Sequence, residues 1–413
     1  MKKYHINNLS CCRICSNPKL TKFLTLDQMP FTDNFVSVNE SAEEFLNDIN
    51  VFYCPKCMVA QTQHDVVVDD YYEDYQYSVG SSQFAREFMD ILALNIKQKF
   101  FNKNDSKPRV LEIGSGDGEQ LLSFKKIGFD VLGFEPSSTL CKIADDKGIS
   151  SIQGLYKDGS NLLLPDKFKT VDAIMLSYTF DHLPDPISFL KNASEILNKN
   201  GIIVIEIHNL ELIAERNEFC LFEHEHSIYL TESTVNSVME RLDFKVIDFN
   251  IVPVKNRRAN SLLFAATKKS SPAYIDSNAV PGTPPEYKNI SKYFSISENI
   301  HSSIERLDNF LGYNFSLGKK IVGYGAGGRG VMTLAACNNA PNIEYMVDMN
   351  VKFDGCLMPK SNIPVKEVNE LLYNKADIIL VFSFGYFEEI RETLSKFGYK
   401  NNQIISILEI LKE

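Results

Sequence analysis

Between residues 108 and 207, apolar runs typical of strands alternate with segments in which apolar residues recur at helical spacing. The expected strands are PRVLEIG, DVLGFEP, TVDAIMLSY and IIVIEI, and the expected helices are GEQLLSFKKIG, STLCKIADDKG and PISFLKNASEILNKNG, the last over 186–201. Neighbouring parallel strands need a long crossover, which a helix usually supplies. The alternation therefore predicts an α/β fold with a Rossmann-like, doubly wound parallel sheet.

A shorter alternation follows near the C-terminus, with strand-like runs at KKIVGYGAG, IEYMVD and DIILVFS after an expected helix over 293–314. Between the two alternations, a stretch with four prolines and a glycine is typical of a linker. The runs LTKFLTL and INVFYC near the N-terminus indicate a β-rich module. We expect a small module over 1–78, a central domain over 79–270, and a linker with a smaller Rossmann-like α/β domain over 271–413.

The net charge of the chain indicates which classes of binding partner to expect. The 413 residues include 53 acidic and 43 basic side chains, a net charge of −10. An acidic surface repels phosphate backbones, so we do not expect nucleic acid as a partner. Because no apolar run of about 18 residues and no signal-peptide pattern occur, we expect a cytoplasmic protein without a membrane partner. The sequence leaves monomer and dimer equally open.

Cysteines cluster at the N-terminal end, where five of the nine lie within the first 57 residues. Four of them form two C-x-x-C pairs, namely Cys12, Cys15, Cys54 and Cys57. Each pair places two thiolates on a tight turn, and two pairs complete a tetrahedral zinc site with no open position for water. We therefore predict a structural zinc, with Cys11 and His5 as nearby substitutes.

The run VLEIGSGDG is a strand that ends in a glycine-rich turn and opens a helix. Such a turn alone is compatible with a dinucleotide, but it lacks the G-x-G-x-x-G spacing. Glu112 can face a cationic methionine end, and Glu135, expected at an exposed strand end, can accept ribose hydroxyls. The pattern thus favours S-adenosylmethionine. The candidate cofactor residues are Glu112, Gly114, Gly116, Asp117, Glu135, Pro136 and Ser177.

The segment FEHEHSIYLT places two histidines and two carboxylates within four residues at the expected active-site edge of the sheet. In an extended segment, Glu223 and Glu225 would share one face and His224 and His226 the other. A histidine beside a carboxylate is a usable general base near neutral pH, whereas the spacing of a zinc H-E-x-x-H helix is absent. His182 follows the strand TVDAIMLSY and is a further candidate.

A second glycine turn, GYGAGGRG over 323–330, suggests a phosphate cradle with Arg329 as its charge partner. Asp348 at the end of the next strand would also suit a nicotinamide cofactor. A nicotinamide-dependent sugar oxidoreductase is therefore one alternative function.

In this order, the motifs resemble those of the sugar C-methyltransferase family, and the resemblance covers nearly the whole chain. It rests on the double C-x-x-C, MPFTDNFV, the YxYS at Tyr75–Ser78, EIGSGDG, GFEP, HEHSIYLT, GYGAGGRG and the run 348–364. The resemblance implies a zinc-binding N-terminal domain, a central class I methyltransferase domain and a C-terminal domain that helps to bind a nucleotide sugar. Family members commonly have tyrosine at the position of Glu223, G-G-S-L-R at 259–263, and W-N at Phe384–Gly385.

By resemblance, His226 is the base that deprotonates a nucleotide-linked 4-keto deoxysugar at carbon 3, and Glu225 is its partner. His182 and Tyr77 lie around the sugar carbonyl, and His224 completes the catalytic candidates. The candidate substrate-binding residues are Tyr75, Glu223, Tyr229, Tyr324, Gly325, Ala326 and Arg329. The remaining alternatives are an O- or N-methyltransferase of such a sugar and a non-catalytic zinc-ribbon adaptor.

Overall fold

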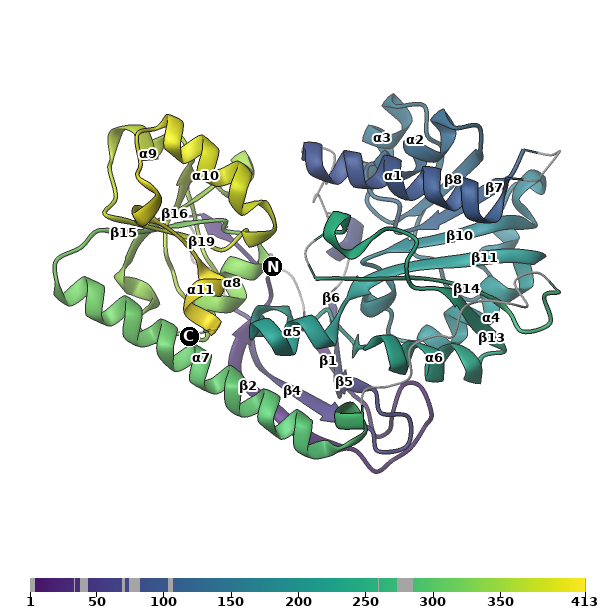
Figure 1. Cartoon of the computed structure of the whole chain (residues 1–413), viewed down its shortest axis with the longest axis horizontal. Helices are drawn as coiled ribbons and strands as arrows, with labels where there is room; N and C mark the ends of the chain where they lie inside the picture. Colours follow the sequence, from purple (N-terminus) through teal and green to yellow (C-terminus); the bar gives the residue numbers. More distant parts are fainter. Residues whose placement is uncertain are drawn as a thin grey trace.

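The protein, seen here as a computed structural model, consists of three parts (Figure 1). The structure describes residues 4–32, 34–37, 44–68, 71–73, 82–102, 107–258, 260–272 and 285–412. In Figure 1 the central domain lies on the right, the C-terminal domain on the left, and strands of the N-terminal module lie below and between them.

The central domain is built on a seven-stranded sheet with the order β13-β14-β11-β10-β7-β8-β9, in which only β14 and its pairings are antiparallel. The strands are β7 (Arg109–Ile113), β8 (Asp130–Glu135), β9 (Ser151–Gln153), β10 (Val171–Ser177), β11 (Leu197–His208), β13 (Phe244–Asp248) and β14 (Ser261–Lys268). The helices are α1 (Gln83–Phe100), α2 (Glu119–Lys126), α3 (Ser138–Asp146), α4 (Pro186–Ile196), α5 (Leu210–Arg216) and α6 (Glu232–Arg241).

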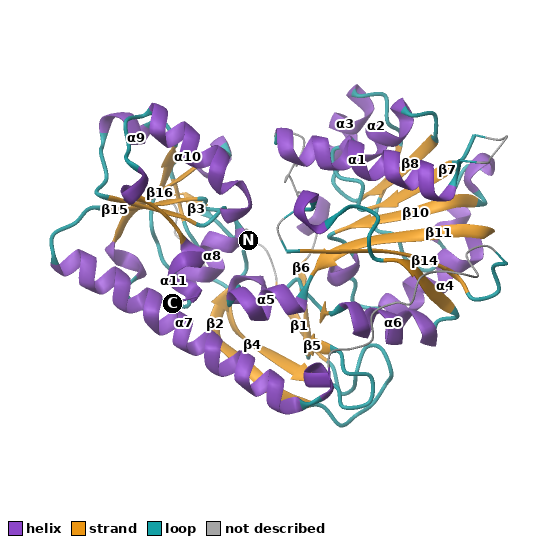
Figure 2. Ribbon diagram, viewed as in Figure 1, coloured by secondary structure: helices purple, strands orange, loops and turns teal. Residues whose placement is uncertain are grey.

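Alternate side chains of the strands fill two separate cores, one on each face of this sheet. Val110 belongs to the core under α1, α2 and α3, whereas the next residue, Leu111, belongs to the core under α4 and α6. Figure 2 shows the same two helical layers above and below the strands. The predicted doubly wound sheet is therefore present.

The expected helix over 186–201 is too long by five residues. Helix α4 ends at Ile196, and strand β11 begins at the next residue. Leu197 pairs with Val171 of β10, and its carbonyl oxygen accepts a hydrogen bond from Lys268 Nζ. Asn198, Asn200 and Gly201 are also poor helix formers, so sheet pairing outweighs the helical spacing there.

The N-terminal module contains β1 (Tyr4–Asn8), β2 (Thr21–Pro30), β3 (Val36–Ser37), β4 (Leu46–Tyr53), β5 (Ala60–Thr62) and β6 (His64–Val68). Strands β2, β4 and β5 form a sheet whose fourth strand, β12 (Ile228–Tyr229), comes from the central domain. Ile228 pairs with Gln61 and Tyr229 with Ala60. The HEHSIYLT segment is therefore held by the sheet of the N-terminal module.

The C-terminal domain is a five-stranded parallel sheet with the order β18-β16-β15-β19-β20. Its elements are α7 (Ile290–Ser316), β15 (Ile321–Tyr324), α8 (Gly328–Ala335), β16 (Ile343–Asp348), β17 (Cys356–Leu357), β18 (Val365–Glu367), α9 (Glu370–Tyr373), β19 (Ile378–Val381), α10 (Phe387–Lys396), β20 (Ile404–Ser406) and α11 (Ile407–Lys412). Strand β17 pairs with β3, which ties this domain to the N-terminal module.

Helix α7 joins the C-terminal domain to the N-terminal module through one shared core. Tyr293 is fully buried at its start, with its ring against Phe23 and Tyr53 at centroid distances of 5.1 and 4.5 Å. Its hydroxyl donates to the Met58 carbonyl oxygen at 3.1 Å. The two parts therefore stabilise each other. None of the described helices is long and apolar enough to cross a membrane.

We expect Tyr293→Ala to lower the free energy of unfolding by about 3–5 kcal/mol, because it removes a fully buried ring between two parts. Tyr313→Ala on the same helix is the matched control. Its side chain is 65% exposed, so the cost should stay within about 0.5 kcal/mol. Urea unfolding followed by tyrosine fluorescence measures both, and equal losses would contradict the shared core.

Candidate active site

The first glycine turn has a backbone conformation that favours glycine, and at Gly114 there is also no space for a side chain. Gly114 has φ +71°, and a Cβ there would lie 2.4 Å from Thr179 Oγ1 at the end of the neighbouring strand β10. Gly116 and Gly118 also have positive φ, and Gly118 precedes the first residue of α2. Only glycine takes this conformation without strain. The turn therefore presents bare backbone at the carboxyl edge of the sheet.

Glu135 at the end of β8 lies against this turn and is buried, not exposed as the sequence suggested. One carboxylate oxygen accepts the Gly116 N–H and the other accepts the Ser137 N–H, both at 2.8 Å. Burial raises its pKa, and the two backbone N–H groups oppose that effect. Each oxygen keeps a lone pair, so the carboxylate can still accept a ribose hydroxyl.

Glu112 is 2% exposed, and its Oε2 has no hydrogen-bond partner. Burial raises the pKa of this carboxyl well above its usual range, and the charge of Arg258 opposes the shift. An orphaned buried oxygen needs a donor, and the ammonium group of S-adenosylmethionine would supply one. Ser177 Oγ is another buried atom without a partner. The donors and acceptors of this edge therefore fit the expected cofactor.

The other predicted cofactor residues lie close to the turn. Asp117 is buried and forms a salt bridge of 3.2 Å with Lys147. Pro136 is partly exposed directly after Glu135. The fold therefore brings the predicted cofactor residues to one edge of the sheet.

Three histidine rings meet beyond the ends of β10 and β11. The ring centroid of His226 lies 4.8 Å from that of His182 and 4.8 Å from that of His208. Nδ1 of His226 donates to the Leu221 carbonyl oxygen at 2.7 Å, so Nε2 of the neutral ring is left as the basic nitrogen. Burial lowers the pKa of His208 to about 4. Burial also lowers the pKa of His182, to about 3, so the two rings beside His226 are neutral near neutral pH.

Asp181 and His208 were not among the sequence candidates. His208 Nδ1 lies 2.9 Å from Asp181 Oδ2. His208 is the last residue of β11, and polar residues at the carboxyl ends of parallel strands gather at one edge, so this signal was present in the sequence.

The predicted alternation of the HEHS segment is wrong. Residues 223–226 form a turn, with the His226 N–H bonded to the Glu223 carbonyl oxygen at 3.3 Å. The turn sends His224 into the N-terminal module, where its Nδ1 lies 2.9 Å from His64 Nε2 and its Nε2 donates to the Met29 carbonyl oxygen. Burial lowers its pKa to about 3. Through these contacts His224 connects the central domain to the N-terminal module. Its side chain is directed away from the cluster around His226.

The two carboxylates of this turn face the other two parts of the chain. Glu225 Oε1 lies 3.9 Å from His182 Nδ1, and its Oε2 accepts the Thr32 hydroxyl at 3.1 Å. A Cβ on Gly328, at the start of α8, would lie 3.5 Å from Glu223 Oε1 and 3.6 Å from Thr32 Cγ2. All three parts therefore meet beside the histidine cluster.

The second glycine turn is closed by contacts within its own domain. The Ala326 N–H donates to Asp348 Oδ2 at 2.7 Å, which fixes this carboxylate against the turn. Gly325 has φ +102°, and a Cβ there would meet Ser383 Oγ at 2.3 Å. Tyr324 is buried in the core of the C-terminal domain. These contacts fix the shape of the second turn.

Arg329, which follows on α8, extends toward the histidine cluster. Its guanidinium lies over the Phe384 ring at 4.8 Å and acts electrostatically on His208 and Tyr178. Tyr229 is buried, and burial raises the pKa of its hydroxyl well above the ordinary value, an effect that a hydrogen bond with the Glu223 backbone opposes. The predicted Tyr75 and Tyr77 lie outside the described residues.

The four predicted cysteines converge. Cys12 and Cys57 Sγ atoms lie 3.5 Å apart, as do those of Cys15 and Cys54, and all four lie within 4.8 Å of one another. Sulfurs at the corners of a zinc tetrahedron are separated by about 3.8 Å. Ser16 and Met58, each directly after a C-x-x-C pair, both have positive φ, so the two turns share one geometry. The donor set fits a zinc with four thiolate ligands.

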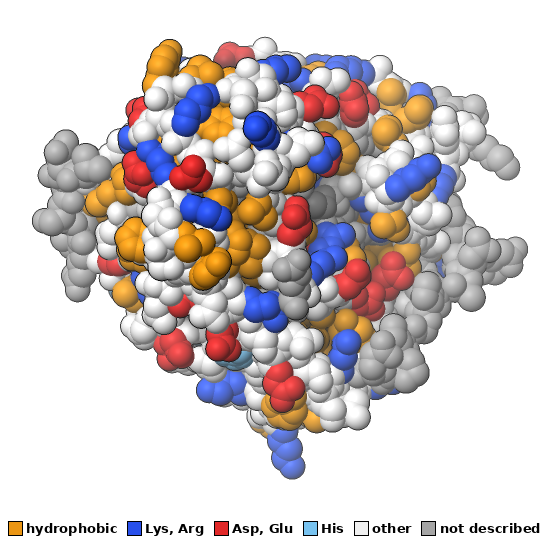
Figure 3. All heavy atoms as spheres, turned by 60° about the vertical axis from the view of Figure 1, so that its left-hand side comes forward, with side chains coloured by type: hydrophobic (Ala, Val, Ile, Leu, Met, Phe, Trp, Pro, Cys, Tyr) orange, Lys and Arg blue, Asp and Glu red, His pale blue; other side chains and the backbone are white. Residues whose placement is uncertain are grey.

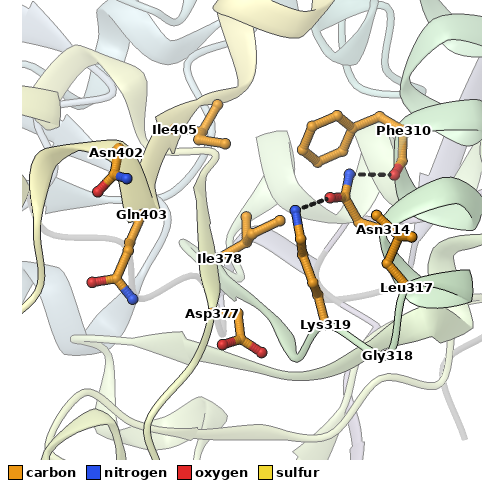
Figure 4. Close-up of a pocket in the computed structure, with 10 residues that line it drawn as sticks. All are labelled: Phe310, Asn314, Leu317, Gly318, Lys319, Asp377, Ile378, Asn402, Gln403 and Ile405. Carbon is orange, nitrogen blue, oxygen red and sulfur yellow. Dashed lines mark hydrogen bonds between the residues drawn. The ribbon is translucent and has the colours of Figure 1, made fainter.

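A hollow of about 580 Å³ lies elsewhere, at the amino ends of β15, β19 and β20 (Figure 4). Lys319, Asp377 and Gln403 are among its lining side chains. Both glycine turns follow the carboxyl ends of strands, so this hollow is at the opposite edge of its sheet from the second turn. Figure 3 shows basic and acidic side chains interspersed with apolar ones over the face that it draws.

Three family models match successive parts of the chain. Residues 12–72 match a zinc binding domain, residues 85–248 a methyltransferase domain and residues 283–408 a C-methyltransferase C-terminal domain. The C-methyltransferase NovU of Streptomyces niveus is 23% identical over 403 residues, which are 94% of this chain and 92% of NovU. Together these matches identify the chain as a C-methyltransferase. It is an S-adenosylmethionine-dependent enzyme with a zinc-binding domain, as the motifs predicted.

Other similarities cover the methyltransferase region alone. The uncharacterized methyltransferase OB1106 of Oceanobacillus iheyensis is 27% identical over 157 residues, which are 34% of this chain and 71% of that protein. Among solved structures, the plantazolicin methyltransferase BpumL in complex with SAH is 18% identical, with a TM-score of 0.35, and covers 45% of this chain and 84% of that one.

We expect about one zinc per chain in this C-methyltransferase when it is purified without added metal, and Cys54→Ser should lose it. Because β5 begins three residues after Cys57 and pairs with β12, loss of zinc should lower methyl transfer as well as stability. Elemental analysis measures the metal, with Cys356→Ser as the control outside the cluster. Less than about half an equivalent in folded, active protein would contradict a structural site.

Glu135→Ala should weaken S-adenosylmethionine binding about 10- to 150-fold, because it removes a charged hydrogen-bond acceptor. The same change frees two backbone N–H groups, so it should also loosen the turn. Ser137→Ala is the matched control, since it removes the N-cap of α3 and keeps the carboxylate. Calorimetric titration in which both variants lose affinity equally would remove Glu135 from the cofactor site.

Proposed function

We propose that the enzyme methylates carbon 3 of a nucleotide-linked 4-keto deoxysugar, for surface glycans or secondary metabolites. The observation that carries this proposal is the histidine cluster beside the cofactor edge, in which the tautomer of His226 is fixed. A carbon becomes nucleophilic only after it loses a proton, and a neighbouring ketone makes that proton removable. A buried neutral imidazole is suited to this task.

His226 is the proposed base. Its Nδ1–H is committed to the Leu221 carbonyl oxygen, so Nε2 takes the proton from the sugar carbon. The electron pair of the broken C–H bond passes into the enolate, whose oxygen needs stabilisation. His182, one fifth exposed beside His226, and Tyr77 are the proposed donors to that oxygen. When bound, S-adenosylmethionine supplies the methyl group as an electrophile.

The substrate would lie where the three parts meet. Arg329 from the C-terminal domain offers a positive charge for a phosphate, and Tyr229 offers a buried hydroxyl. Glu223 stands where family members have a tyrosine, so we propose that this residue affects which sugar is accepted. The family resemblance and the relative NovU support the reaction class.

O- or N-methylation of a similar sugar remains the second candidate, because such a reaction also uses a base. The two candidates differ in their need for the ketone. Mass spectrometry of products from keto sugar nucleotides and their reduced forms separates them. Methylation of a reduced form at the same rate would select the alternative.

His226→Asn should abolish methyl transfer and keep both ligands bound, because asparagine is similar in size and cannot take a proton at neutral pH. The direct assay is deuterium exchange. Wild type in D₂O with a keto sugar nucleotide and S-adenosylhomocysteine should introduce deuterium beside the ketone, and the variant should be slower by about 100- to 10,000-fold.

His301→Asn, on the exposed side of α7, is the control for loss of a histidine. Exchange at the wild-type rate in His226→Asn would transfer the role to His182 or His208. Equal binding of both ligands by calorimetry shows that the variant is folded.

A further inference from the structure

Among the residues that the structure describes, the proposed base has no ionised hydrogen-bond partner of its own. His226 is 4% exposed, and its Nδ1–H donates to a neutral backbone carbonyl. When Nε2 takes a proton, a positive charge forms where water has little access and two other imidazoles lie close. A buried charge without a counter-charge is costly. A carboxylate close to this ring would therefore favour the reaction.

By resemblance that carboxylate would be Glu225, whose contacts include His182 Nδ1 at 3.9 Å and the Thr32 hydroxyl at 3.1 Å. Asp181 is better placed. One carboxylate oxygen of Asp181 and one ring nitrogen each of His208 and His226 all lie within 4.8 Å of one another. Asp181 is 2% exposed, and its Oδ1 is a buried atom without a hydrogen-bond partner.

Asp181 is ionised and fixed in position. Burial opposes its charge, but the hydrogen bond from His208 and the three neighbouring imidazoles hold its pKa below the ordinary range. Its backbone carbonyl accepts the Ser227 N–H at 2.7 Å and the Ser227 hydroxyl at 3.0 Å, which ties it to the residue after His226. The side chain of Asp181 is therefore bonded to His208, and its backbone is bonded to the residue that follows His226.

We propose that Asp181, oriented by His208, is the carboxylate that stabilises the positive charge formed on His226 during proton abstraction. This inference rests on His226 as the proposed base. The sugar C–H bond breaks, its electron pair remains in the enolate, and the proton bonds to Nε2 of His226. Asp181 keeps its charge throughout and takes no proton. It is a positioning residue that acts electrostatically, as the buried aspartate of a catalytic triad does.

The other charged or titratable groups that face the cluster include His182, Glu225, Arg329 and Tyr229, whose ring lies 6.4 Å from that of His226, with the Tyr178 ring against His208 at 4.7 Å. Arg329 opposes a positive charge on His208. Burial also keeps the pKa of His208 at about 4, which leaves this ring neutral as a hydrogen-bond donor to Asp181.

Asp181→Asn tests the proposal, because asparagine keeps the shape and an oxygen that can accept from His208, and removes only the charge. Without the anion, the imidazolium of His226 is less stable, so the acidic limb of the kcat/KM profile should move down by about one to two pH units. The rate on the plateau should fall tenfold or more. Glu225→Gln is the matched control and should move the limb less.

A shift of the limb in Glu225→Gln with none in Asp181→Asn would overturn the proposal. Loss of folding or of ligand binding would lower the rate without moving the limb to lower pH, so a purely structural role predicts a different profile. Elemental analysis tests whether the three side chains bind a metal instead. A second metal equivalent per chain that is lost in Asp181→Asn would mean that the three side chains ligate a cation, and that also contradicts the proposal.

Titration of the ¹⁵N-labelled histidines by NMR needs no substrate. In the free enzyme, the His226 ring should protonate at lower pH in Asp181→Asn than in wild type, and an unchanged titration would refute the pairing. If wild type methylates no keto sugar nucleotide while this shift is present, the proposed substrate is wrong and the pairing stands. The two inferences can therefore fail separately.

Discussion

The pairing of β12 with β5 is the contact on which the active site depends. Because of this pairing, the segment that carries His226 joins the sheet of the N-terminal module and not the seven-stranded sheet of the central domain. The Thr62 N–H also donates to the Ser227 carbonyl oxygen at 3.1 Å. A methyltransferase sheet alone provides the cofactor edge, but the proposed base is positioned by another part of the chain. Under this proposal, a zinc with no open coordination position would still affect catalysis.

The same module also reaches the C-terminal domain, through β3 with β17 and through the core around Tyr293. Thr32 contacts Glu225 and lies beside Gly328 at the start of α8. Glu223 brings a carboxylate to this helix N-terminus, where the partial positive charge of the helix favours an anion. The helix that follows the second glycine turn therefore contacts the other two parts of the chain. The phosphate-cradle motif in the sequence does not predict these contacts.

Features encoded by neighbouring residues could be predicted, and features made by distant residues could not. The strand–turn–helix of VLEIGSGDG, the C-x-x-C pairs and the helix over 293–314 each depend on local spacing, and the structure has them. The burial of Glu135 depends on the glycine turn 19 residues earlier, so its place in the sequence could not show it. The turn at 223–226 forms because His224 finds its partners in β2 and β6, more than 150 residues away.

Buried charge sets the final constraint on the chemistry. Burial lowers the pKa of both His182 and His208, so neutral rings surround His226, and Asp181 and Glu225 are carboxyl groups that face this cluster. Such a site is poorly suited to receive an anionic reacting group, because a second negative charge would lie beside Asp181. It is suited to a neutral carbon acid, whose proton creates the positive charge that Asp181 is placed to balance, while the enolate forms on the side of His182. A ketone-activated carbon meets this condition, and the phosphates of a nucleotide would be held farther away, on the side of Arg329.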